Sequence, residues 1–141
     1  MRVRDWEERL SAFLAEARDK PFAWSSNDCI TFATAAAAAM TGEDKAADYR
    51  GQYTDRKGAA TILKRLGKGT LLRTVNAEFE ACPPAFAQRG DLVWFHGSVG
   101  ICVGAEALFV GEERLARVDG VMLRAGLVAV PRGLWAKAWR V

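Results

Sequence analysis

The hydrophobic positions follow a helical period in the first half of the chain and alternate in short runs in the second half. A first amphipathic helix is predicted by five apolar residues at helical spacing: Trp6, Leu10, Phe13, Leu14 and Ala17. Asp5 and Glu8 form the pattern of a capping box at its start, and Pro21 marks its exit.

Three further helices are expected in this half. The second spans about residues 27–40, and Gly42 supplies its stop. Its many alanines predict a close approach to a neighbouring element. Shorter helices are predicted at residues 57–66 and 71–79, after a polar and aromatic loop at residues 48–55.

From Arg89 onwards, short apolar runs are separated by turn residues, which is typical of strands. The predicted strands are residues 92–95, 99–103, 108–110, 121–123, 127–130 and 139–141. Helices followed by strands predict an α+β fold, with the N-terminal helices packed on a small antiparallel sheet. One domain over residues 1–141 is expected, with a helical part at 1–80 and a β part at 89–141.

The composition of the chain argues against some classes of function. Half of the residues are hydrophobic and the net charge is only +3, with no concentrated basic run, so nucleic acid is not an expected partner. The longest apolar run, residues 32–40, is too short to span a membrane. The first 14 residues carry no signal-peptide core, which predicts synthesis in a cytoplasm.

No cofactor or metal is expected. The cysteines at positions 29, 82 and 102 lack the paired spacing of a disulfide framework or a zinc site, which suits reduced thiols. The glycines of the segment 67–70 lack the spacing of a phosphate-binding loop and indicate a helix stop.

The candidate chemistry centres on Cys29, at the expected start of the second helix. Free backbone N–H groups and the helix dipole favour a thiolate there, whereas a small buried hydrophobic residue is the alternative. Asp28 is interpreted first as the helix cap, with assistance to the nucleophile segment as its alternative. Trp24 is expected to pack beside Cys29 and shape a pocket, or simply to fill the core.

Three other residues have simpler structural interpretations. Asp91 is expected to stabilise a turn through its side chain. Cys82 is expected to pack within a loop. Cys102 is expected to pack on the same face of a strand as Ser98.

Two segments together resemble the NlpC-type cell-wall cysteine peptidases, a papain-like family. Trp24…Asp28-Cys29 before a small-residue helix is similar to the nucleophile segment of that family. Residues 90–93 (Gly-Asp-Leu-Val) and 99–101 (Val-Gly-Ile) resemble its first two strands. The resemblance covers about residues 21–110 and implies a papain-like fold with a cysteine nucleophile, a histidine base and a third polar residue.

When the three catalytic roles of that family are placed on the matching positions of this sequence, they predict a degraded catalytic triad. The nucleophile falls on Cys29, the base on Ser98 and the orienting residue near Val110. A serine cannot take the thiol proton near neutral pH, and a valine side chain accepts no hydrogen bond, so most of the rate should be lost. His96, the only histidine, could swing over Cys29 as a displaced base; the alternative is a solvent-facing residue at a hairpin end. A second rescue is that the helix N-terminus alone lowers the thiol pKa enough for slow chemistry.

The whole chain is also similar to a narrower family of small proteins coded by tailed phages, prophages and gene-transfer-agent-like clusters. The shared features are a Pro-Phe-x-Trp-x-x-x-Asp-Cys start at residues 21–29, an Arg-Gly-Asp middle at 89–91 and an Ala-Trp-Arg-Val end at 138–141. This resemblance implies a protein of the virion's distal tail, made in the host cytoplasm, with tail-tip and hub proteins as partners.

Three functional hypotheses follow. The first is a structural subunit of the distal tail with an impaired peptidase site, whose basic, tryptophan-rich segment 132–140 contacts partners. The second is a working peptidase that cuts the stem peptides of peptidoglycan during entry, with Cys29 as nucleophile and His96 as base. The third is a cytoplasmic tail-assembly factor.

Overall fold

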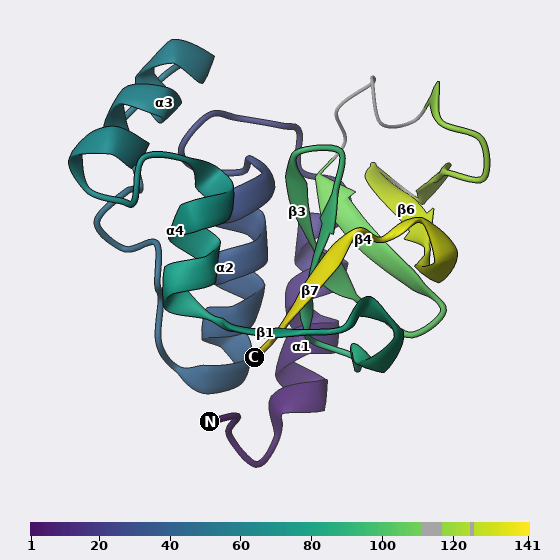
Figure 1. Cartoon of the computed structure of the whole chain (residues 1–141). Helices are drawn as coiled ribbons and strands as arrows, with labels where there is room; N and C mark the ends of the chain where they lie inside the picture. Colours follow the sequence, from purple (N-terminus) through teal and green to yellow (C-terminus); the bar gives the residue numbers. More distant parts are fainter. Residues whose placement is uncertain (111–116, 125) are drawn as a thin grey trace.

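The computed structural model describes residues 1–110, 117–124 and 126–141, and it confirms a mixed α+β fold. Figure 1 shows the helices α2, α3 and α4 on one side of the molecule and the strands on the other. The helices are α1 (Trp6–Ala17), α2 (Cys29–Thr41), α3 (Arg56–Arg65) and α4 (Leu71–Glu78). The strands are β1 (Glu80–Cys82), β2 (Leu92–Phe95), β3 (Ser98–Cys102), β4 (Glu106–Val110), β5 (Met122–Arg124), β6 (Leu127–Pro131) and β7 (Lys137–Arg140).

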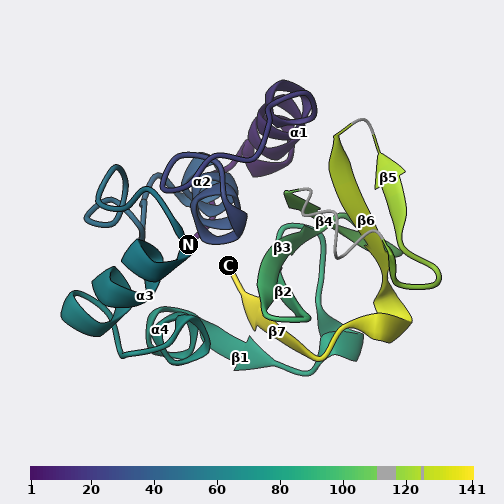
Figure 2. The ribbon, with the colours of Figure 1, turned by 90° about the horizontal axis from the view of Figure 1, so that it is seen from above.

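Every strand pair among the described residues is antiparallel, in the order β1-β7-β2-β3-β4-β6-β5. Seen from above, this sheet curls strongly (Figure 2). The edge strand β1 is absent from the sequence prediction, which places Cys82 in a loop. Cys82 instead pairs with Ala138 of β7. A strand this short, ending at a Pro-Pro pair, acquires its structure from a partner far along the chain.

Helix and strand ends differ slightly from the predicted ones. α2 begins at Cys29 rather than at residue 27, because Asn27 still pairs with Ala23 in an isolated bridge and Asp28 is extended. Gly42 ends the helix in the left-handed conformation, as predicted. β7 begins at Lys137, earlier than the predicted strand at 139–141.

The predicted capping box of α1 is wrong. Asp5 adopts φ −100° and ψ 29°, and its side chain caps no backbone N–H. Its carboxylate instead accepts a hydrogen bond from Nε of Arg9 at 2.9 Å, and this contact lowers the pKa of Asp5. The pair is solvent-exposed, so α1 depends mainly on burial of its apolar face, including Leu10 and Ala17.

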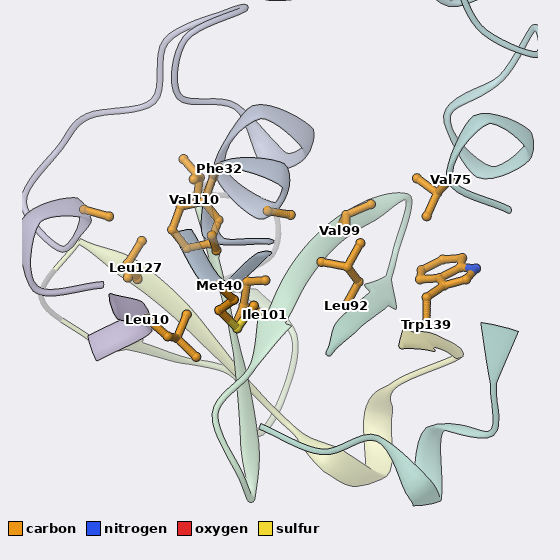
Figure 3. Packing of buried hydrophobic residues seen from close by; sticks show 13 residues of the cluster. Leu10, Phe32, Met40, Val75, Leu92, Val99, Ile101, Val110, Leu127 and Trp139 are labelled. Atoms are coloured by element: carbon orange, nitrogen blue, oxygen red, sulfur yellow. The ribbon is translucent and has the colours of Figure 1, made fainter. Parts of the chain in front are cut away.

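Strand alternation builds two cores on opposite faces of the sheet. In β2, Leu92 belongs to the first core, against the helices, and Val93 belongs to the second, inside the curl. In β3, Ile101 likewise belongs to the first core and Cys102 to the second. Figure 3 shows the first core, where side chains of α1 and α2 meet those of the sheet.

The alanine-rich helix α2 lies directly on the sheet. Ala33 and Ala36 are fully buried in the first core, between the larger Phe32 and Met40. Because these side chains are small, the helix backbone can approach β3 and β4, which are its main sheet contacts. The predicted close approach is therefore confirmed.

Asp91 ties the two ends of the chain to the sheet. Its side chain accepts hydrogen bonds from Nη2 of Arg2 at 2.8 Å, from the backbone N–H of Val141 at 3.1 Å and from that of Gln88 at 2.9 Å. The Gln88 contact confirms the expected turn. The contacts to both chain ends are additional and make Asp91, only 2% exposed, a buried structural anion.

The C-terminal segment cannot act as the predicted partner surface through its tryptophans. Trp139 is fully buried in the first core, and Trp135 is 6% exposed in the second. Nε1 of Trp139 donates to Oδ1 of Asn76 at 2.9 Å, which ties β7 to α4. None of the described helices is long and apolar enough to cross a membrane.

Candidate functional site

Cys29 is the first residue of α2 and forms part of the wall of a cavity of about 110 Å³. The other walls come from α3, α4 and the segments before and after α2. Most of the lining is apolar, including Phe22, Trp24, Ile30, Leu63, Val75 and Phe79. Trp24 therefore lies at the cavity beside Cys29, as expected from the sequence.

Asp28 caps α2 and is almost completely enclosed, with 3% of its surface exposed. One carboxylate oxygen accepts from the backbone N–H of Thr31 at 3.0 Å and from its hydroxyl at 2.8 Å. The other accepts from the backbone N–H of Ser25 at 2.9 Å and from the hydroxyl of Tyr53. The predicted cap is confirmed, and the carboxylate is fully occupied by four donors.

Tyr53 is the site residue that the sequence prediction missed. It lies in the loop between α2 and α3, is 7% exposed, and lines the cavity together with Cys29. Its ring lies 6.4 Å from that of Trp24 in an edge-to-face arrangement. An aromatic residue within a polar loop was the available signal, but its link to Asp28, 25 residues away in sequence, is purely tertiary.

Burial raises the pKa of Tyr53 well above its usual value, and the hydrogen bond to Asp28 raises it further. A raised pKa means that the fold favours the neutral phenol, so this stabilisation is complete below pH 10 and is lost as the pH rises. Each pH unit above about 10 should lower the free energy of unfolding by up to ~1.4 kcal/mol through this group.

A spectroscopic titration tests this expectation. We expect Tyr53 to remain un-ionised by absorbance at 295 nm until the protein unfolds. Tyr53→Phe should remove that part of the alkaline loss of stability. Tyr49→Phe is the control, since Tyr49 is the other tyrosine and burial also raises its pKa. Ionisation of Tyr53 near pH 10 in the folded protein would contradict the assigned hydrogen bond.

The backbone of the segment before Cys29 turns sharply at Ser25. Ser25 adopts φ 63°, a left-handed conformation that is uncommon for residues other than glycine. Its N–H is fixed by Asp28, and the neighbouring Phe22 and Trp24 rings pack edge to face with centroids 5.0 Å apart. This turn places Trp24 and Cys29 at one cavity.

The candidate base positions lie outside that cavity. His96 and Gly97 form the turn between β2 and β3, with φ 47° and 79°, a two-residue hairpin of the type that fits twisted strands. His96 is exposed, and its ring centroid lies 4.3 Å from that of Phe95. Ser98 is 2% exposed at the start of β3 and shares a strand face with Cys102, as expected. Neither His96 nor Ser98 lines the cavity.

A family model described as "Domain of unknown function (DUF6950)" matches residues 1–141 of the chain. The chain belongs to the DUF6950 family. A search of curated proteins gives no match for this DUF6950 chain.

Val110 and the two remaining cysteines of this DUF6950 protein lie in its hydrophobic cores. Val110, at the position of the orienting residue, is 2% exposed and packs in the first core. Cys82 and Cys102 are buried in the second core, and burial raises the pKa of Cys82. No group of three or more His, Cys, Asp or Glu side chains suited to a metal ion occurs in the described part of the chain.

The cavity beside Cys29, of about 110 Å³, has room for an occupant. Ala46 and Ala59 line the space where larger side chains could fill it. The site therefore combines a thiol, an aromatic wall and an open apolar volume.

Proposed function

We propose that this DUF6950 protein has an NlpC-like, papain-like fold whose peptidase site is impaired, and that it serves as a structural subunit of the distal tail of a phage or related particle. The observation that carries the proposal is that neither candidate base, His96 or Ser98, lines the cavity at Cys29. Cys29 occupies the start of α2 and a cavity, whereas the described residues around that cavity include no histidine.

We propose that the impairment lies in proton transfer. A cysteine hydrolase needs a base within hydrogen-bond reach of its thiol, and the base must itself be oriented. Ser98 cannot act as that base, and Val110 cannot orient one. Asp28 is adjacent to Cys29, but its carboxylate already accepts hydrogen bonds from three residues. It therefore holds this segment together through these hydrogen bonds.

The structural role is supported by exposed apolar side chains. Phe86 is 67% exposed, and Met122 and Leu123 of the edge strand β5 are 55% and 67% exposed. Large apolar groups on a surface are suited to protein contacts. We therefore propose that tail partners bind at Phe86 or at the edge strand β5 rather than at the tryptophans of segment 132–140.

Particle composition tests the structural role. We expect the protein to copurify with assembled particles and to remain after a high-salt wash that removes loosely bound protein. Presence in the lysate but absence from particles would reject the structural subunit and favour the cytoplasmic assembly factor.

The alternative is an active peptidase with His96 as a displaced base. One observation favours it: the β2–β3 turn and the N-terminus of α2 lie at the same end of the molecule (Figure 1). Under this alternative, purified peptidoglycan would release stem-peptide fragments in the presence of the protein, and Cys29→Ala would abolish that release.

We expect His96→Ala to leave the rate of iodoacetamide labelling at Cys29 unchanged within about twofold, whereas an activating base would contribute far more. Labelling is measured by mass spectrometry of the Cys29 peptide. Ser26→Ala is a matched control, since Ser26 is exposed and close to the thiol in sequence. A large loss of labelling in His96→Ala, together with Cys29-dependent digestion, would replace the proposal with the peptidase.

A further inference from the structure

The carboxylate of Asp28 and the hydroxyls of Thr34 and Thr74 in the cavity wall are already paired within the protein. Asp28 accepts from four donors. The hydroxyl of Thr34 donates to the carbonyl of Ile30 at 2.6 Å and accepts from Nη2 of Arg50 at 3.2 Å. The hydroxyl of Thr74 donates to the carbonyl of Thr70 at 2.7 Å. These three side chains therefore offer little unused hydrogen-bonding capacity to an occupant.

The positive charge at the margin of the cavity is also paired. Nζ of Lys45 lies 3.0 Å from a carboxylate oxygen of Glu43 and 3.8 Å from one of Glu78. Lys45 and Glu78 contribute to the lining, and their side chains are 31% and 46% exposed. A single lysine between two carboxylates offers no unpaired positive charge for an anionic ligand.

These observations indicate the chemical class of the occupant. We propose that the cavity is a binding site for a small, uncharged apolar group, which lies against the aromatic wall and beside the Cys29 thiol. Dry apolar cavities of roughly 150 Å³ bind benzene, so a cavity of about 110 Å³ suits a group of about four to six carbon atoms. This binding requires no catalysis and is therefore independent of whether the peptidase site works.

Thiol-directed reagents that differ only in their side group test this site. Pentyl methanethiosulfonate is compared with its 2-sulfonatoethyl and 2-(trimethylammonio)ethyl counterparts. In each case the Cys29 sulfur attacks the reagent's sulfenyl sulfur, and a new disulfide forms. The bond to the sulfonyl group breaks, methanesulfinate leaves with the electron pair, and the thiol proton passes to solvent.

After normalisation to a small free thiol, we expect Cys29 to react at least about tenfold faster with the pentyl reagent than with either charged one. The Cys29 peptide is quantified by mass spectrometry, which separates it from Cys82 and Cys102. Equal normalised rates for the three reagents would overturn the proposal. The two charged reagents have opposite signs, so the protein's net charge cannot produce the preference.

Two neighbouring alanines of α3 supply matched variants. Ala59 lines the cavity, and Ala60 is exposed. We expect Ala59→Leu to fill the space and remove the preference for the pentyl reagent, and Ala60→Leu to retain it. If Ala59→Leu does not fold by circular dichroism, Ala59→Val is used in its place. A pentyl preference that survives the filled cavity would overturn the proposal.

A noncovalent probe separates the cavity from thiol chemistry. Benzene near saturation should raise the melting temperature of the wild type and of Cys29→Ala alike, because a ligand that binds only the folded state stabilises it. Ala59→Leu should show no such rise. Absence of a rise in the wild type would reject the binding site while leaving the proposed function untouched, since that is tested by particle composition.

Discussion

Asp28→Ala is expected to lower the free energy of unfolding by about 3–5 kcal/mol, measured by urea denaturation. The substitution removes the cap of α2 and leaves two buried donors, the Tyr53 hydroxyl and the Ser25 N–H, without their acceptor. Because Asp28 also fixes the turn before Cys29, the cavity should lose its shape in the same variant.

Two other aspartates separate these contributions. Asp55 caps α3 through the N–H of Gly58 at 2.7 Å but is exposed, so Asp55→Ala should cost only about 1 kcal/mol. Asp48 is exposed and caps no helix among those described, so Asp48→Ala should change stability by less than about 0.5 kcal/mol. If Asp28→Ala costs no more than Asp55→Ala, the buried network around Asp28 contributes little beyond the cap.

Trp139→Ala is expected to cost about 3–5 kcal/mol, since it empties a large volume in the first core. The side chain is fully buried, packs edge to face on Trp94 with centroids 6.2 Å apart, and holds Asn76 of α4. Denaturation followed by circular dichroism measures this loss independently of tryptophan fluorescence.

Trp139→Phe is the graded control. It keeps an aromatic ring but removes the Nε1 donor to Asn76, so its cost should fall clearly below that of Trp139→Ala. A negligible effect of Trp139→Ala would indicate that this residue is not part of the core, and the interpretation of segment 132–140 as a partner surface would return.

Local signals in the sequence predicted much of the fold. The spacing of apolar residues located α1 to α4, and Gly42 marked the end of α2, because helix periodicity and a left-handed cap depend on neighbouring residues. β1 depended on pairing with β7, more than 50 residues later, so no local pattern could reveal it. The capping box at Asp5 failed for a local reason instead, since Arg9, one helical turn away, binds the same carboxylate.

In the candidate site, too, the sequence could predict local groupings of residues but not long-range contacts. Trp24, Asp28 and Cys29 lie within six consecutive residues, so the sequence could group them at one site. Tyr53 joins them only because its loop folds back over the start of α2, and the cavity exists only because α3 and α4 pack there. Volume and burial are properties of the assembled chain, which residue patterns do not encode directly.

The shared anchor at Asp91 bears on how further sequence could be attached to the domain. Arg2 and Val141 both bond to this one carboxylate, and Figure 1 shows the two chain ends close together. Segments fused to either end would emerge from the same small area of the surface. The domain can thus be inserted into a loop of a host protein through short linkers, with little separation between the entry and exit points.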